Sequence, residues 1–264
     1  MLAKRYNIGP TMERDIYLKR FFPRKAIPHY LCPRCGAHMR SGVPDEEDRA
    51  DSKQNRHIDG YGHEDERSVF HIKLECTHPK CGEPVFVVGE GTVEYEDTVD
   101  DKGNRDYEYV TWYEPKFFMP HLRMFKIPEK TPYSVAESVN ASFNLFFVGS
   151  GSALNEIRNA VEFLMDELGV PRKGPNEATP PVEVRWDLDT RVGKLSGEHR
   201  KYKQHLQAIK NLGNWGSHAV ETTRRDVLDA YEVLHYVLDG IYNQRDVYVT
   251  SLAKRIKADK RGLI

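Results

Sequence analysis

Residues 32–36 read CPRCG and residues 76–82 read CTHPKCG, and these two short clusters hold all four cysteines of the 264-residue chain. Two residues between thiols let both sulfurs bind one tetrahedral metal ion, and a glycine after the second cysteine permits a positive φ. The four-residue gap of the second cluster is looser but workable. We therefore expect one zinc ion with the ligands Cys32, Cys35, Cys76 and Cys81.

A disulfide pairing is the alternative for these cysteines. Disulfides are typical of secreted chains, and the N-terminal sequence MLAKRYNIGPTMERD lacks the apolar segment of a signal peptide. We therefore expect a cytoplasmic protein with a metal site. Four thiolates close the coordination shell, so the expected zinc has no open position for water and is structural.

The segments around the cysteines have the alternation of strands. Strands are predicted for residues 68–76, 84–96 and 106–120. A strand, a cysteine turn and a returning strand make a zinc ribbon. Residues 45–66 are strongly acidic and almost without apolar side chains, so we expect an acidic insertion over residues 41–66 that forms a mobile loop.

From Thr131 the apolar spacing changes to that of helices. Four amphipathic helices are predicted, with a break at residues 149–152, a stop at Gly169 and a capping box at Thr223 and Asp226. Residues 170–197 are rich in Pro and Gly and predict a long connection with a brief extended piece at 182–186. The four apolar stripes are Val135, Val139, Phe143, Phe146 and Phe147; Leu154, Ile157, Val161, Leu164 and Leu168; Tyr202, Leu206, Ile209 and Leu212; and Val227, Tyr231, Leu234, Leu238 and Ile241.

The predicted fold class is α+β, with a β-rich zinc-ribbon domain over residues 1–130 and a helical bundle over residues 131–264. The formal net charge is −1, from 39 Lys and Arg against 40 Asp and Glu, so overall charge indicates no partner. No segment approaches the ~18 apolar residues of a membrane helix. The C-terminal tail AKRIKADKRGLI is basic, and it is either a phosphate-contacting surface or an ordinary solvated face.

Residues 210–218, KNLGNWGSH, place poor helix formers between two predicted helices. Such local disagreement is typical of a functional site. On a helix Asn214 and His218 share one face, where His218 can act as general acid or base and Asn214 can orient a phosphate or a ribose hydroxyl. The alternative is a helix C-terminus, with Gly213 as the stop and Asn214 as a cap.

Arg158 and Glu162 lie four residues apart, next to the apolar stripe of the second helix. A charge near a core is costly unless it is paired. We therefore expect these two residues to pair with each other, or one of them to reach the segment of Asn214 and His218. An ordinary surface ion pair is the alternative.

Two segments, ALNEIRNAVEFLMDELG and AIKNLGNWGSHAVETTRRDVLDAYEVLHYVLDGIY, carry a family resemblance. The chain from about Thr131 to Asn243 resembles the HEPN-like domain of unknown function found alone, fused to zinc ribbons, or at the end of type I restriction motor subunits. The resemblance implies a helical bundle that pairs as a homodimer. Active members of the wider superfamily are metal-independent ribonucleases, with an arginine and a histidine a few residues apart.

In this comparison Asn214 and His218 match the family's Asn and His, whereas Gly213 stands where the catalytic arginine is usual. Lys210, one turn upstream, or Arg158, on the facing helix, could supply the missing cation for the transition-state phosphate. The resemblance also implies a role in defence against phage, with RNA or another nucleic acid and a defence-system protein as partners.

Three functions remain open. We rank first a binding or regulatory module for nucleic acid or nucleotide, second a metal-independent RNA endonuclease, and third a structural adaptor. The candidate catalytic residues are His218, Asn214, Arg158, Glu162 and Lys210. The sequence contains no GxxxxGK loop, GxSxG elbow or HExxH helix, which excludes the commonest ATPase, hydrolase and metalloprotease motifs.

Overall fold

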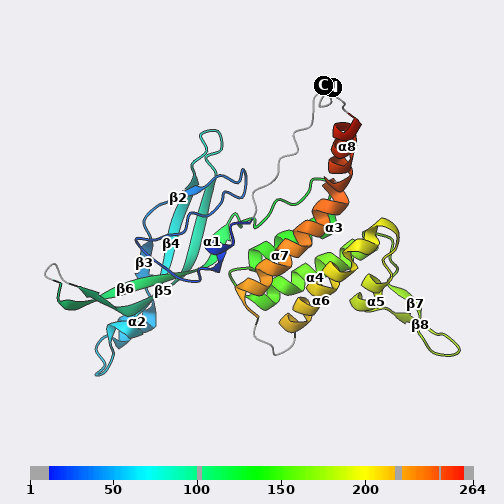
Figure 1. The fold of residues 1–264 in the computed structure, drawn as a ribbon. Helices are drawn as coiled ribbons and strands as arrows, with labels where there is room; N and C mark the ends of the chain where they lie inside the picture. The colour runs from blue at the N-terminus through cyan, green and yellow to red at the C-terminus, as the bar shows by residue number, and fades with distance from the viewer. Residues whose placement is uncertain (1–11, 100–102, 218–221, 244, 259–264) are drawn as a thin grey trace. The chain divides into compact units, whose positions relative to one another are not determined.

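The computed structural model of the chain describes residues 12–99, 103–217, 222–243 and 245–258 (Figure 1). The chain folds as two compact units, a sheet unit over Glu13–Arg123 and a helical unit from Met124 onward. The predicted border lay after residue 130. The fold class is mixed α+β, as predicted. None of the described helices is long and apolar enough to cross a membrane.

The sheet unit is built on three long antiparallel strands that follow one another along the chain (Figure 1). These strands are β4 (Arg67–Cys76), β5 (Pro84–Val99) and β6 (Arg105–Met119). They confirm the three predicted strands. The short strand β1 (Phe22–Pro23) pairs with β6, while β2 (Met39–Ser41) and β3 (Asp45–Asp48) both pair with β4.

One face of this sheet is buried in the core of the unit. Alternate β4 residues Phe70, Ile72 and Leu74 are buried and their neighbours are exposed, as expected for a strand with one covered face. The rings of Phe70 and Tyr113 pack edge to face with centroids 4.9 Å apart. The short helix α1 (Arg14–Leu18) adds the buried ring of Tyr17.

The acidic segment is ordered, so the prediction of a mobile loop is wrong. It contains β3, the helix α2 (Ala50–Asn55) and the 3-10 turn η1 (His63–Asp65). Backbone pairing of β3 with β4 supplies hydrogen bonds that the side-chain composition does not reveal. Buried Ser52 fixes α2, because its hydroxyl accepts from the N–H of Arg67 at 2.8 Å and donates to the carbonyl of Arg67 at 3.1 Å.

Cations neutralise the carboxylates of β3. The ion pairs are Arg24 with Glu46 at 3.2 Å, Lys53 with Glu47 at 2.9 Å and Arg56 with Asp48 at 2.6 Å. Two of these cations come from the acidic segment itself, so its local charge is lower than the run of carboxylates suggests.

The helical unit contains the four predicted helices, α3 (Tyr133–Leu145), α4 (Ser150–Glu167), α6 (Lys203–Ser217) and α7 (Arg224–Leu238). Helix α4 contacts each of the other three. The predicted apolar stripes are buried, with half-buried Leu168, Leu212 and Ile241 at their ends. A buried hydrogen bond of 2.8 Å joins the hydroxyls of Ser142 and Tyr231.

The long connection after α4 contains more structure than predicted. The strands β7 (Lys173–Pro175) and β8 (Glu183–Arg185) form a hairpin, and α5 (Leu188–Gly193) and the 3-10 helix η2 (Gly197–Tyr202) follow. Asp187 caps α5 by accepting from the N–H of Thr190 at 2.8 Å. This cap supports a helix too short to show apolar periodicity. After α7, a π-helical turn, η3 (Asp239–Asn243), leads into α8 (Arg245–Ala258).

Candidate functional site

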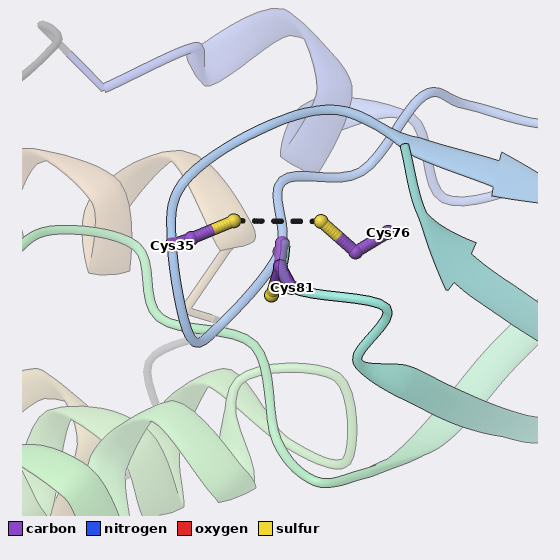
Figure 2. Close-up of side chains that lie close together, drawn as sticks. Cys35, Cys76 and Cys81 are labelled. Atoms are coloured by element: carbon purple, nitrogen blue, oxygen red, sulfur yellow. Dashed lines mark hydrogen bonds between the residues drawn. The ribbon is translucent and has the colours of Figure 1, made fainter. Parts of the chain in front are cut away.

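The four cysteines meet at one end of the sheet. Figure 2 shows three of them, Cys35, Cys76 and Cys81. Cys32 and Cys35 lie in the turn before β2, Cys76 ends β4, and Cys81 lies in the turn that leads into β5. Each turn is followed by a glycine with positive φ, 76° at Gly36 and 58° at Gly82. The two predicted cysteine clusters therefore form one site.

The sulfur positions fit a tetrahedral metal ion. The Sγ atoms of Cys32 and Cys81 are 3.8 Å apart, those of Cys35 and Cys76 are 3.4 Å apart, and all four lie within 4.8 Å of one another. A zinc tetrathiolate with bonds of about 2.3 Å has sulfur–sulfur edges of about 3.8 Å. All four cysteines are free thiols, so the disulfide alternative does not describe this structure.

The surroundings of the thiols differ. Burial raises the pKa of Cys32, and it raises the pKa of Cys76 to about 12, although the N–H of His78 lies 3.4 Å from the Cys76 sulfur. A hydrogen bond from the N–H of Ala37 is the main cause that lowers the pKa of Cys35. Buried thiols resist ionisation until a cation binds them, because metals take cysteine as thiolate. The feature that suits a metal ion is the donor set itself, four sulfur atoms within 4.8 Å of one another.

In the helical unit, Glu162 is bound by Arg191 of α5 in place of its expected partner Arg158. The Arg191 side chain is 1% exposed, and it also donates to Asp166 Oδ1 at 2.6 Å and to the carbonyl of Val170 at 2.9 Å. Arg172 binds Asp166 as well. Hydrogen bonds from Arg172 and then Arg191 lower the pKa of Asp166. We call these residues, Arg191, Glu162, Asp166 and Arg172, the Arg191 cluster. Their ion pairs hold α5 against α4.

Positive charges lie near the two carboxylates at the start of α5, with Lys210 near Asp187 and Asp189 and Arg158 near Asp187. Lys210 Nζ is 2.9 Å from Asp189 Oδ1. The pKa of Asp187 is lowered, chiefly by the N–H of Thr190, with added positive charge from Lys210 and Arg158. Among the described residues, the buried Nε of Arg158 has no hydrogen-bond partner.

Helix α6 continues through Gly213 to Ser217, so the alternative in which Gly213 ends the helix is wrong. Asn214 is therefore on helical backbone. The side chain of Asn214 and the whole of His218 lie outside the described residues. The structure thus places Arg158 and Lys210 near Asp187, places Glu162 in the Arg191 cluster, and leaves the pairing of Asn214 with His218 a prediction.

The sheet carries a second group of residues that the sequence reasoning missed. Four apolar side chains of β5 and β6 point away from the core and are between 41% and 72% exposed. We call them the apolar face: Phe86, Val88, Phe117 and Met119. Their register pairs Phe86 with Met119 and Val88 with Phe117.

Two basic side chains of β4 border the apolar face. Lys73 is paired with Phe86, and His71 is paired with Val88. His71 Nε2 lies 3.7 Å from Asp45 Oδ2. The signal for this surface is in the sequence, because residues 84–88 read PVFVV and are apolar on both faces of a strand whose sheet has only one buried face.

Residues 20–118 match a family described as a domain of unknown function, DUF8608, and residues 140–259 match a family described as a domain of unknown function, DUF4145. No curated protein matches the chain, and no solved structure matches it. The two matches fall on the sheet unit and the helical unit respectively.

Proposed function

We propose that the protein binds single-stranded nucleic acid, RNA above all, through the apolar face, and that it acts as a recognition module and not as a nuclease. The main support for this proposal is the pair of exposed phenylalanine rings on neighbouring strands. Phe86 and Phe117 are diagonal neighbours in the register of β5 and β6, a spacing within reach of aromatic side chains.

The chemistry of this surface suits unpaired bases. Stacking on an aromatic ring contributes about 1–3 kcal/mol per base, and it needs no particular sequence. Lys73 lies beside Phe86 and His71 beside Val88, so cationic or hydrogen-bonding groups border the rings on the β4 side. A strand whose bases stack on the rings can therefore contact these groups with its phosphates.

The contacts of the helical unit favour recognition over cleavage. Glu162 is bound by Arg191 and Lys210 by Asp189, so two of the candidate catalytic groups already have partners. A cation paired with a carboxylate is less available to stabilise a phosphate transition state. RNA cleavage remains the second candidate, because the buried Nε of Arg158 has no partner among the described residues.

We further propose that the four-cysteine site holds Zn²⁺ in a structural role. Soft thiolate ligands and tetrahedral sulfur spacing favour zinc among common metal ions. Four sulfurs leave no position for water, so the ion would stabilise the turns of Cys32, Cys35, Cys76 and Cys81 without entering a reaction.

The resemblance to the HEPN-like domain adds an expected cellular role to this proposal. We propose a cytoplasmic, HEPN-like protein that pairs as a homodimer through its helices and recognises nucleic acid during defence against phage, with a protein of the defence system as a further partner. A structural adaptor without nucleic-acid affinity is the remaining alternative.

The binding test uses fluorescently labelled 12-nucleotide single-stranded RNA and DNA, with fluorescence anisotropy as the readout. We expect Phe86→Ala and Phe117→Ala each to weaken binding by about 1–3 kcal/mol, roughly fivefold to 150-fold. Tyr133→Ala, at an exposed aromatic residue of α3, is the matched control and should bind normally. Equal affinity of the folded Phe variants and wild type would contradict the proposal.

The cleavage test separates the two candidate functions. Wild type and His218→Ala are incubated in EDTA with tRNA, single-stranded RNA and DNA, and product sizes are measured. We expect intact nucleic acid in both samples. Cleavage by wild type alone would replace the recognition proposal with a metal-independent nuclease that uses His218.

A further inference from the structure

The outer parts of β5 and β6 carry a second exposed aromatic group, which the proposed function does not use. We call it the tyrosine cluster: Tyr95, Tyr107 and Tyr109. The register pairs Tyr95 with Tyr109, and pairs Tyr107 with Asp97. Directly paired residues project from the same face of a sheet, so the three rings and the Asp97 carboxylate share one face.

The three rings contact one another while they stay open to solvent. Tyr95 and Tyr107 are stacked with ring centroids 5.0 Å apart, and Tyr109 packs edge to face against both at 6.1 and 6.2 Å. Each side chain is 45% to 55% exposed. The ring of His63, in η1, lies 4.8 Å from that of Tyr109. The result is a preformed aromatic platform.

The hairpin that carries this platform has a strongly negative net charge. Residues 93–98 and 105–111 contain five carboxylates and one guanidinium, a net charge of −4. Glu96 and Glu108 are directly opposed across the two strands. Both project from the face opposite the tyrosine rings, as do Glu94 and Asp106, so Asp97 is the carboxylate of this group that shares the platform's face. The other four contribute to the negative field of the hairpin as a whole.

From this geometry we infer that the tyrosine cluster is a docking site for an arginine- or lysine-rich segment of a partner protein. Guanidinium and ammonium groups bind to the faces of aromatic rings, and neighbouring carboxylates attract them from solution. Asp97 stands directly across from Tyr107 and can accept hydrogen bonds from a guanidinium that lies over the rings. The same carboxylates repel a nucleic-acid backbone.

This site is separate from the apolar face. Along β5 the odd-numbered side chains, such as buried Val85 and Val87, face the core, and the even-numbered Phe86 and Val88 face away from it. Tyr95 continues the odd-numbered row beyond the core. The two surfaces therefore lie on opposite faces of β5 and can be tested independently.

The experiment measures binding of a fluorescein-labelled nona-arginine peptide to the full chain by fluorescence anisotropy. We expect the double variant Tyr107→Leu, Tyr109→Leu to weaken binding about fivefold or more, and Tyr107→Phe, Tyr109→Phe to retain it because the ring faces remain. Asp97→Asn should weaken binding and reduce its dependence on salt.

The matched control lies on α3, where the exposed hydroxyl of Tyr133 is 3.1 Å from Glu137. Tyr133→Leu removes a tyrosine beside a carboxylate and should leave peptide binding unchanged. The inference is overturned if the folded leucine double variant binds the peptide as tightly as wild type, or if labelled single-stranded RNA binds the tyrosine cluster more tightly than the peptide does.

Discussion

The imidazole of His235 lies nearly parallel to the ring of Phe125, with centroids 4.8 Å apart. Burial lowers the pKa of His235, and the nearby charge of Asp239 only partly opposes this effect. Because the folded pKa lies below the unfolded one, neutral His235 contributes stability above the unfolded pKa, and this contribution is lost as the pH falls through the folded pKa.

We therefore expect the free energy of unfolding of wild type to fall between about pH 7.5 and about pH 5. His235→Phe keeps the ring stack without a titrating group, so its loss over that interval should be smaller. Urea unfolding followed by circular dichroism at both pH values measures the difference. His57→Gln, at an exposed position, is the control, and an equal loss in all three proteins would show that His235 is not responsible.

Arg191 is the buried charge that joins α5 to α4. Its buried guanidinium binds two carboxylates and two carbonyls, and removing one side of a buried charge network costs about 3–5 kcal/mol. Arg191→Met should therefore destabilise the protein by about 3 kcal/mol in chemical denaturation. Lys210→Met removes a more exposed ion pair and should cost at most about 1 kcal/mol. Similar costs for both variants would contradict the assigned role of Arg191.

The four-cysteine cluster could be predicted from sequence, because the spacing of thiols in short turns determines which sulfurs can meet. Arg191 could not. It lies in a connection rich in Pro and Gly, and its partners Glu162 and Asp166 are about 25 to 29 positions away. Helical spacing at Arg158 and Glu162 suggested a local ion pair. Glu162 instead binds the buried guanidinium of Arg191, whose N–H donors are held in one plane.

At the scale of elements, the start of α7 is fixed by a reciprocal cap. The side chain of Asp226 accepts from the N–H of Thr223 at 2.8 Å, and the Thr223 hydroxyl accepts from the N–H of Asp226 at 3.3 Å. Both bonds satisfy backbone groups that have no partner within the helix. The structure thus confirms the predicted capping box.

Thr223→Ala removes the hydroxyl and should lower the free energy of unfolding by about 1 kcal/mol. Thermal and urea unfolding would measure the change. Thr222→Ala changes the same residue type one position earlier, outside the capping box, and serves as the control. The cap would have no role in stability if both variants unfolded like wild type.

The strands and helices with long apolar periodicity could be predicted, and the short elements could not. β3 consists of four acidic residues, so its sequence resembles a disordered segment, and only the edge of β4 makes it a strand. The six-residue α5 depends on Asp187 and Arg191. In both cases contacts from distant parts of the chain override the local composition.

All four cysteines of the proposed zinc site belong to the sheet unit. The double variant Cys35→Ser, Cys76→Ser should lose zinc and the folded sheet unit, because metal binding contributes directly to folding free energy in small zinc domains. The helical unit should keep its helical circular dichroism signal. Metal analysis by mass spectrometry and far-ultraviolet circular dichroism test both statements.

Lys80→Gln alters an exposed residue in the same cysteine turn and is the control, which should retain zinc. One equivalent of zinc in the cysteine double variant would show that the metal binds elsewhere. Loss of the helical signal together with the sheet would show that the two units depend on each other for folding.

The change from alternating to helical apolar spacing predicted the order of the two units. Their surfaces were harder to predict, because an exposed ring and a buried ring look alike in sequence. Phe70 is buried and Phe86 is exposed on neighbouring strands of one sheet, and only the register separates them.

The acidic segment also has a consequence for evolution. Cys35 and Cys76 meet across 41 positions of chain, so the segment between the two cysteine turns is anchored at both ends. Doubling the length of a closed loop costs only about 0.6 kcal/mol. Natural variants can therefore gain or lose residues in the turns between α2 and β4, and acquire new surface features there, while the metal site and the three long strands keep their geometry.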